Sequence, residues 1–214
     1  MRESPDRGRG GQSEPRAGQA PAKPVLYVDR EFNATAAKIG PGEYYVTQRD
    51  MLIVTVLGSC VSACVRDPTT QIGGMNHFML PEHGGDPDSP LSGSARYGAY
   101  AMEVLINNLI GMGARRDKLE AKLFGAGRVM PGMPDIGKRN AVFALDYLRR
   151  EKIPVLAEDL GNPHPSKIYF FPHTGRVLVK RLKTLRNDTI LTREQTYAER
   201  LDRLSVSGEA DVFK

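Results

Sequence analysis

The chain has no tryptophan, only two cysteines, and no apolar run of the length that a membrane helix requires. A helix needs about 20 consecutive apolar residues to cross a bilayer, so we predict no membrane insertion. The N-terminus also lacks the apolar stretch of a secretory signal. Cys60 and Cys64 alone cannot form a disulfide framework. We therefore expect a cytoplasmic protein, in a reducing compartment where a reactive thiol persists.

Concentrated positive charge is also missing from the body of the chain. The net charge is +5, and basic residues exceed acidic ones in segments 1–24 and 176–203. The segment between them is close to neutral, and aromatic residues make up only 7% of the chain. Nucleic-acid binding calls for a basic face, with stacking rings where the strand is single. We therefore predict no nucleic-acid partner.

Three regions follow from composition. Residues 1–24 contain many Arg, Pro and Gly residues but no aromatic one, so we predict a disordered N-terminal tail. Residues 25–204 are predicted to form a single domain, since the chain is 40% hydrophobic and long enough to bury a core. Residues 205–214 are predicted to be a flexible C-terminal tail.

Hydrophobic patterning predicts an α/β (α+β) layered fold, with a mixed β-sheet and helices packed on it. Residues 60–65 fit either a strand or a short helix. The predicted strands are 43–47, 51–57, 72–80, 119–123, 153–158 and a hairpin of 167–171 with 176–180; the predicted helices are 95–110 with Ser94 as N-cap, 136–150, and 193–204 begun by a capping box at Thr192.

Cys60 follows a glycine–serine break at the end of the apolar run 51–57. A free cysteine is most often inert packing. A sharp turn at Gly58 and Ser59, however, would expose the sulfur and leave backbone N–H groups free to stabilise an oxyanion. We predict that Cys60 is a catalytic nucleophile, and that Gly58 and Ser59 bind the oxyanion or substrate. Cys64 is interpreted as apolar packing.

His77 lies in an apolar segment that a small sheet must place near the Cys60 strand. A buried imidazole needs a hydrogen-bond partner, and a thiol would serve. A thiol and an imidazole together are what a cysteine hydrolase requires. Thr55 and Asn76 are the nearest candidates to orient the base, and Asn76 is also predicted to bind the oxyanion or substrate. For Thr55, the alternative is a β-branched strand former without a role in the site.

Two later patterns are less specific. The glycine turn at 125–127 lacks the lysine and the fuller glycine pattern of a phosphate loop, so we interpret it as a turn packed near the Cys60 loop. Asn140 is interpreted as either a contact of the site or a simple helix cap.

Five segments occur in a fixed order: LGSCV at 57–61, GMNHFMLP at 74–81, KLFGAG at 122–127, IG-x-RN at 136–140 and TGRV at 174–177. Together they resemble the chemoreceptor glutamine deamidase family, CheD. The resemblance extends from about residue 47 to about residue 183, which is most of the predicted domain. Its specific part is the Cys–His pair with the flanking residues.

The resemblance implies hydrolysis of glutamine side chains to glutamate on the cytoplasmic domains of bacterial chemoreceptors. It also implies a layered sandwich related to deamidating toxins, a Cys–His–Thr triad, no metal and no cofactor, and the CheC phosphatase as a partner. Cys60 would be the nucleophile and His77 the base. The family's threonine corresponds to Val54 here, so either Thr55 takes its role through a bulge or another group does. The same chemistry would cleave glutamyl methyl esters.

Two other functions stay open at this point. A non-catalytic chemotaxis adaptor that binds receptors or the CheC phosphatase would keep its function after Cys60→Ala. A cysteine peptidase or small-molecule amidase would instead turn over short peptides or free amides.

Overall fold

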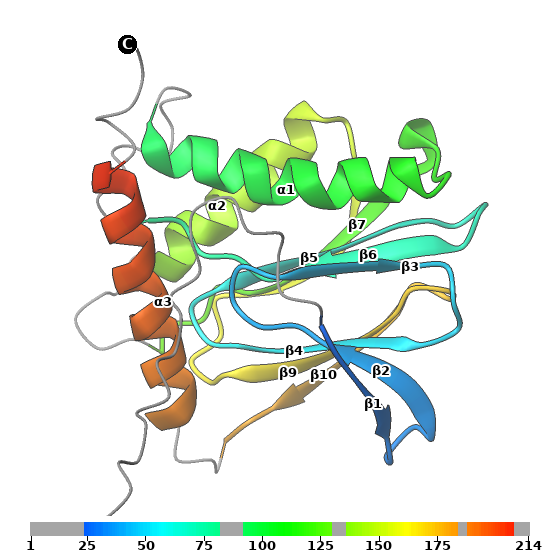
Figure 1. The fold of residues 1–214 in the computed structure, drawn as a ribbon, viewed down its shortest axis with the longest axis horizontal. Helices are drawn as coiled ribbons and strands as arrows, with labels where there is room; N and C mark the ends of the chain where they lie inside the picture. The colour runs from blue at the N-terminus through cyan, green and yellow to red at the C-terminus, as the bar shows by residue number, and fades with distance from the viewer. Residues whose placement is uncertain (1–23, 82–91, 130–135, 184–187, 208–214) are drawn as a thin grey trace, which may run out of the picture.

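Two β-sheets and three α-helices form the part of the chain that the structure describes (Figure 1). The computed structural model describes residues 24–81, 92–129, 136–183 and 188–207. The strands are β1 (Val25–Asp29), β2 (Ala34–Lys38), β3 (Tyr44–Thr47), β4 (Leu52–Leu57), β5 (Val61–Asp67), β6 (Ile72–Asn76), β7 (Glu120–Gly125), β8 (Val155–Leu160), β9 (Ser166–Phe171) and β10 (Arg176–Arg181). The helices are α1 (Gly93–Gly111), α2 (Ile136–Arg150) and α3 (Asp188–Ser207), with a short 3-10 turn at Arg116–Lys118.

Both sheets are mixed. The first has the order β1-β2-β4-β9-β10, and only β2 and β4 are parallel in it. The second has the order β3-β6-β5-β7-β8, and only β7 and β8 are parallel. The predicted α+β layered class is confirmed, and the strands divide into two sheets where the sequence pattern suggested one.

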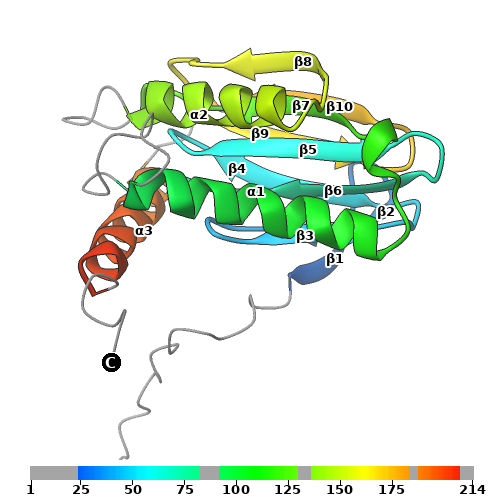
Figure 2. The same ribbon diagram turned by 90° about the horizontal axis from the view of Figure 1, so that it is seen from above.

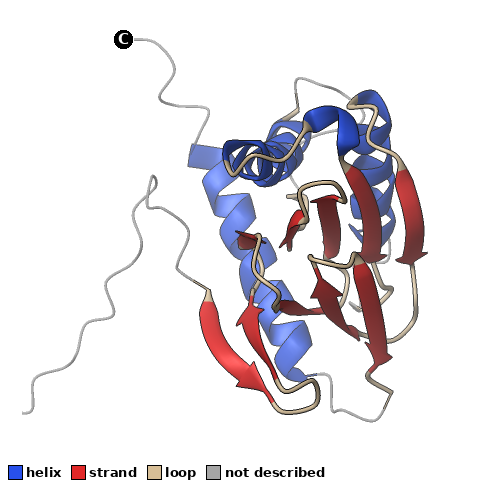
Figure 3. Cartoon of the chain, turned by 90° about the vertical axis from the view of Figure 1, so that its right-hand side faces the viewer, coloured by secondary structure: helices blue, strands red, loops and turns tan. Residues whose placement is uncertain are grey.

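The layers have separate cores. Helices α1 and α2 lie on the outer face of the second sheet, as Figure 2 shows from above. The inner faces of the two sheets pack on each other through a second cluster, which includes Cys60 and Cys64. Helix α3 lies across one end of the sheets (Figure 1 and Figure 3) and adds Ala198 and Leu201 to that second cluster.

Strand β4 is buried on both faces, as its continuous apolar sequence predicted. Leu52 and Val54 pack on the outer side of the first sheet, whereas Ile53 and Leu57 pack between the sheets. Because side chains alternate along a strand, Thr55 lies on the inner face with Ile53 and Leu57. The fold therefore directs a hydroxyl group into an otherwise apolar layer.

Several predicted boundaries need correction. Helix α2 has the predicted bounds, and residues 60–65 prove to be mostly strand, since β5 begins at Val61. Helix α1 is capped by Ser92, whose side chain accepts from Ala95 N–H, and not by Ser94, whose hydroxyl donates to the Pro81 carbonyl. Helix α3 begins at Asp188, so the predicted capping box at Thr192 lies inside the helix.

The predicted tails lie mostly outside the described residues. Of the segment 1–24 only Pro24 is described, and of the segment 205–214 only the residues up to Ser207, which belong to α3. Among the described residues, no helix has both the length and the apolar character needed to cross a membrane.

Gly125 offers a test of the contact between β7 and the segment that carries Cys60. It has a positive φ of 101°, and a Cβ there would lie 2.3 Å from the Cys60 carbonyl oxygen. We expect Gly125→Ala to lower the free energy of unfolding by more than about 1 kcal/mol, measured by urea denaturation. Gly111→Ala is the control, because nothing lies within 4 Å of the added carbon. Equal unfolding midpoints for the two variants would contradict this account.

Candidate active site

The connection from β4 to β5, residues 58–60, is held in place through its carbonyl groups. We call it the 58–60 loop. The Gly58 carbonyl accepts a hydrogen bond from Gly127 N–H and the Cys60 carbonyl accepts one from Ala126 N–H, both at 2.7 Å. The Ser59 carbonyl accepts from Asn140 Nδ2 at 2.9 Å. The glycine turn at 125–127 is therefore packed against this loop, as predicted. Asn140 also accepts from Leu80 N–H at 2.9 Å, so it ties the loop to a neighbouring segment.

The N–H groups of the same loop converge on one carboxylate, that of Glu194 in α3. Gly58 N–H donates to Oε1 and Ser59 N–H to Oε2, both at 2.7 Å. Cys60 N–H donates to Oε1 at 3.3 Å, and the Ser59 hydroxyl donates to Oε2 at 2.6 Å. Converging backbone donors beside a nucleophile have the geometry of an oxyanion hole. The loop can therefore stabilise negative charge next to the thiol.

Glycine at position 58 makes this approach possible. A Cβ there would lie 2.7 Å from Glu194 Oε2 and 2.8 Å from Val129 Cγ2. A side chain would therefore occupy the space that the carboxylate now fills.

Strand pairing brings Cys60 and His77 onto one face. Val61 and Phe78 form an antiparallel bridge, with both backbone hydrogen bonds between them at about 3 Å. Cys60 and His77 each directly precede one member of this pair, which makes them diagonal neighbours on the same side of the sheet. The predicted proximity of the two side chains is thus a consequence of the register.

Thr55 fixes the orientation of the imidazole. Its hydroxyl donates to the Ile39 carbonyl at 2.9 Å and lies 2.8 Å from His77 Nδ1. A hydroxyl has only one proton, so with that proton on Ile39 it accepts from Nδ1–H. His77 then carries its lone pair on Nε2, which has no hydrogen-bond partner among the described residues. This is the tautomer that a general base needs.

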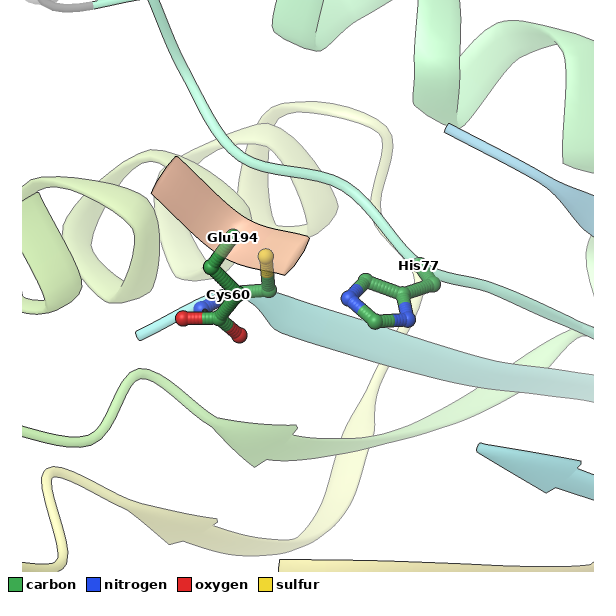
Figure 4. Close-up of side chains that lie close together, drawn as sticks. All are labelled: Cys60, His77 and Glu194. Atoms are coloured by element: carbon green, nitrogen blue, oxygen red, sulfur yellow. Dashed lines mark hydrogen bonds between the residues drawn. The ribbon is translucent and has the colours of Figure 1, made fainter. Parts of the chain in front are cut away.

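Cys60, His77 and Glu194 form a compact buried group (Figure 4). A ring nitrogen of His77, Cys60 Sγ and a carboxylate oxygen of Glu194 all lie within 4.8 Å of one another. Such a donor set has the residue types of a zinc site. The Glu194 oxygens, however, already accept hydrogen bonds from the 58–60 loop. The geometry therefore fits anion binding by the loop.

Burial keeps both reacting groups neutral in this arrangement. It raises the pKa of the Cys60 thiol, and the neighbouring Glu194 carboxylate raises it further. Burial lowers the pKa of His77 to about 4, an effect that the Glu194 charge partly opposes. At neutral pH the pair is therefore a thiol and an imidazole, and the proton has to move during the reaction.

Of the other residues predicted for the site, all but Asn76 lie at it. Gly58, Ser59 and Thr55 all lie around the Cys60–His77 pair, whereas the Asn76 side chain does not join it. The Asn76 amide accepts from Ala63 N–H and donates to the Ala101 carbonyl, so it links β6 to β5 and α1. Cys64 packs between the sheets, as expected.

No sequence pattern predicts Glu194 as a residue of the site. It lies in a predicted terminal helix, and an acidic residue in a charged helix carries no local signal of a site. Asn140, which the sequence allows as either a site contact or a helix cap, holds the 58–60 loop through the Ser59 carbonyl.

Comparison with known proteins identifies the family. A family model described as "CheD chemotactic sensory transduction" matches residues 79–181. A protein of Thiobacillus denitrificans named "Probable chemoreceptor glutamine deamidase CheD" is 63% identical over 190 residues, which cover 88% of this chain and 94% of that protein. Proteins of the same name from Janthinobacterium sp. and Herminiimonas arsenicoxydans are 60% and 59% identical, with the same coverage. The chain belongs to the CheD family.

The matched regions differ in what they include. The CheD family model begins at residue 79 and so does not include Thr55, Cys60 or His77. The matches to whole CheD proteins cover 88% of the chain. The uncovered remainder of the chain is shorter than the distance from either chain end to Thr55, Cys60 or His77. All three residues therefore lie within the region of similarity.

Thr55 reaches His77 without a bulge. From Ile53 to Leu57, β4 pairs with β9 in continuous register. Of the two explanations that the sequence offers for the one-residue offset, the bulge is therefore wrong. Alternation along β4 already places Thr55 on the inner face, and Val54 on the outer one.

The buried histidine makes stability depend on pH. Between its ordinary pKa of 6.5 and its folded pKa of about 4, the unfolded chain binds a proton that the folded chain does not. The free energy of unfolding should therefore fall as pH falls through this window, by at most about 1.4 kcal/mol per pH unit. Urea denaturation at several pH values measures this. His77→Gln should show a shallower dependence, and an unchanged slope would contradict the assignment.

Proposed function

We propose that this protein is a protein-glutamine deamidase that converts glutamine side chains of methyl-accepting chemotaxis receptors to glutamate. The observation that carries the proposal is the convergence of the 58–60 loop donors on a glutamate carboxylate beside Cys60 and His77. The product of glutamine deamidation is that same chemical group. The printed names of the relatives, chemoreceptor glutamine deamidases, agree with this chemistry.

Acylation begins when the glutamine carboxamide enters with its carbonyl oxygen on the 58–60 loop. His77 Nε2 takes the thiol proton while Cys60 Sγ attacks the amide carbon. The N–H groups of the loop stabilise the oxyanion of the tetrahedral intermediate. The carbon–nitrogen bond then breaks, and His77 gives its proton to the departing ammonia. A thioester between Cys60 and the glutamyl group remains.

Deacylation repeats these steps with water. His77 takes a proton from a water molecule, whose oxygen attacks the thioester carbonyl. The carbon–sulfur bond breaks, the thiol regains its proton, and a glutamate carboxylate leaves. One water is consumed for each glutamine, and the proton lost by the newly formed carboxylic acid converts the released ammonia to ammonium. Thr55 keeps the Nδ1 proton in place throughout, since its hydroxyl accepts from that position.

Partners follow from this chemistry and from the family. We propose the cytoplasmic domains of chemoreceptors as the protein substrate, with the enzyme acting in the cytoplasm. The CheC phosphatase is proposed as a partner on the basis of the family resemblance alone. A glutamyl methyl ester would form the same thioester with methanol as the leaving group, so methylesterase activity is proposed as a second reaction of the site.

The alternative of a non-catalytic adaptor is less well supported. An adaptor has no need for three backbone donors aimed at one point beside a thiol, or for an imidazole held in the tautomer of a base. These features cost free energy, because they bury polar groups whose partners must be supplied.

The direct test is mass spectrometry of a receptor cytoplasmic fragment incubated with the native chain, Cys60→Ala or Cys60→Ser. We expect glutamine-to-glutamate conversion with the native chain and none with either Cys60 variant. Neither the methyl group of alanine nor the weakly nucleophilic hydroxyl of serine replaces the thiolate. Cys64→Ala is the matched control and should retain activity. Conversion by Cys60→Ala would refute the deamidase function. So would a receptor fragment that binds the native chain and all variants but shows no glutamine conversion with any of them.

Thr55 permits a sharper test of the base. Thr55→Val removes the hydroxyl and leaves the shape, so His77 loses the partner of Nδ1. We expect the deamidation rate to fall by a large part of the roughly 10²–10⁴-fold that a positioned base supplies. Thr55→Ser keeps the hydroxyl and should retain most of the activity. Steady-state rates on the receptor fragment measure both, and equal rates for the valine and serine variants would exclude the orienting role.

A further inference from the structure

Glu194 lies in the substrate site of its own chain. It is 1% exposed, and the donors described above bind both of its carboxylate oxygens. All of these donors belong to the 58–60 loop, which is more than 130 residues away in sequence. Burying a carboxylate is costly unless such partners are supplied. The residues that would stabilise the reaction's oxyanion are therefore engaged by a side chain of α3.

The engaged group is chemically the product of the proposed reaction. Deamidation of a glutamine side chain yields a glutamate side chain, and Glu194 presents one to the oxyanion donors beside Cys60 Sγ. The absence of a Cβ at Gly58 gives this carboxylate its space. The contact thus has the character of an enzyme–product complex formed within one chain.

Helix α3 is fixed to the body by one face. Glu194, Ala198 and Leu201 are buried and recur at helical spacing, while Arg193 and Gln195 beside Glu194 are exposed. The hydroxyl of Tyr197 on the same face contacts that of Tyr97 in α1. The helix lies at the end of the sheets as a separate element (Figure 1). Its Glu194 lies beside Cys60.

We propose that α3 occupies the substrate site as an internal product analogue, so that a receptor glutamine reaches Cys60 only when α3 withdraws. This inference rests on the proposed deamidase function. In the closed arrangement Glu194 excludes substrate from the oxyanion donors, and its charge also disfavours the thiolate. Withdrawal of the helix removes both effects together.

The first experiment converts the analogue into a substrate. In Glu194→Gln, the side chain presents a carboxamide to Cys60. Attack by Sγ would release ammonia, and water would then hydrolyse the thioester to regenerate a glutamate at position 194. Mass spectrometry of the purified variant in heavy-oxygen water should detect glutamate at this position with one labelled oxygen. The adjacent and exposed Gln195 is an internal control and should stay unconverted. The carboxamide at position 194 should also persist when Glu194→Gln is combined with Cys60→Ala.

The second experiment needs no deamidation. Glu194→Ala removes the carboxylate, and Glu199→Ala removes an exposed carboxylate from the same helix. We expect the rate of Cys60 alkylation by iodoacetamide, followed by peptide mass, to rise about tenfold or more in Glu194→Ala. It should stay at the native value in Glu199→Ala. Receptor deamidation by Glu194→Ala should rise in parallel, and thermal unfolding of each variant verifies that it is folded.

The outcomes separate the two proposals. Conversion of receptor glutamines by the native chain, without conversion of the carboxamide at position 194 in Glu194→Gln, would overturn the role of α3 and leave the deamidase function intact. Conversion of neither would overturn the deamidase function, and with it the identity of Glu194 as a product analogue. Equal alkylation rates in the native chain, Glu194→Ala and Glu199→Ala would overturn the covering role of α3 in any case.

Discussion

The site depends on how the carbonyl groups of the 58–60 loop are held. Each of them accepts a hydrogen bond from behind, two from the glycine turn at 125–127 and one from Asn140. Because a peptide group is planar, a fixed carbonyl also fixes the direction of the N–H that follows it. The N–H groups of Ser59 and Cys60, two of the three that bind Glu194, are thus aimed by hydrogen bonds on the far side of their own peptide planes. Close approach to Cys60 is possible because Gly125 has no side chain.

Anion binding and turnover place opposing demands on such a loop. Donors that stabilise an oxyanion also stabilise the product carboxylate, since both present negatively charged oxygens. A carboxylate offers acceptors to all the donors around Glu194, whereas a carboxamide places an NH₂ group where one acceptor would be. The site therefore favours the charged product and the charged intermediate over the neutral substrate. In the proposed mechanism, release of glutamate has to compete with this preference.

The sequence predicts those parts of the site that are local. The break after β4, the thiol behind it and the apolar segment with His77 lie close together in the chain, and the inner face of β4 carries Thr55. It does not predict the division into two sheets, because strands buried on both faces lose the alternation that identifies a face. Asn76 is adjacent to His77 in sequence, but its side chain accepts a hydrogen bond from a backbone N–H of β5 and does not reach the site. Glu194 reaches the 58–60 loop from a distant helix, and no local pattern encodes that contact.

Helix α3 is the element that can move most easily to admit a substrate, because it contributes least to the core around Cys60. The thiol lies between two sheets, and its neighbours on β5 and β6 belong to continuous ladders whose separation would expose apolar core. Helix α3 contributes only one face to that core, and its exposed side is solvated. Withdrawing it costs the burial of a few side chains and the hydrogen bonds of one carboxylate. Because those same hydrogen-bond donors are what a receptor glutamine would gain, substrate binding offsets part of the cost of opening. The preference of the donors for a carboxylate leaves the closed arrangement favoured until the receptor supplies further contacts.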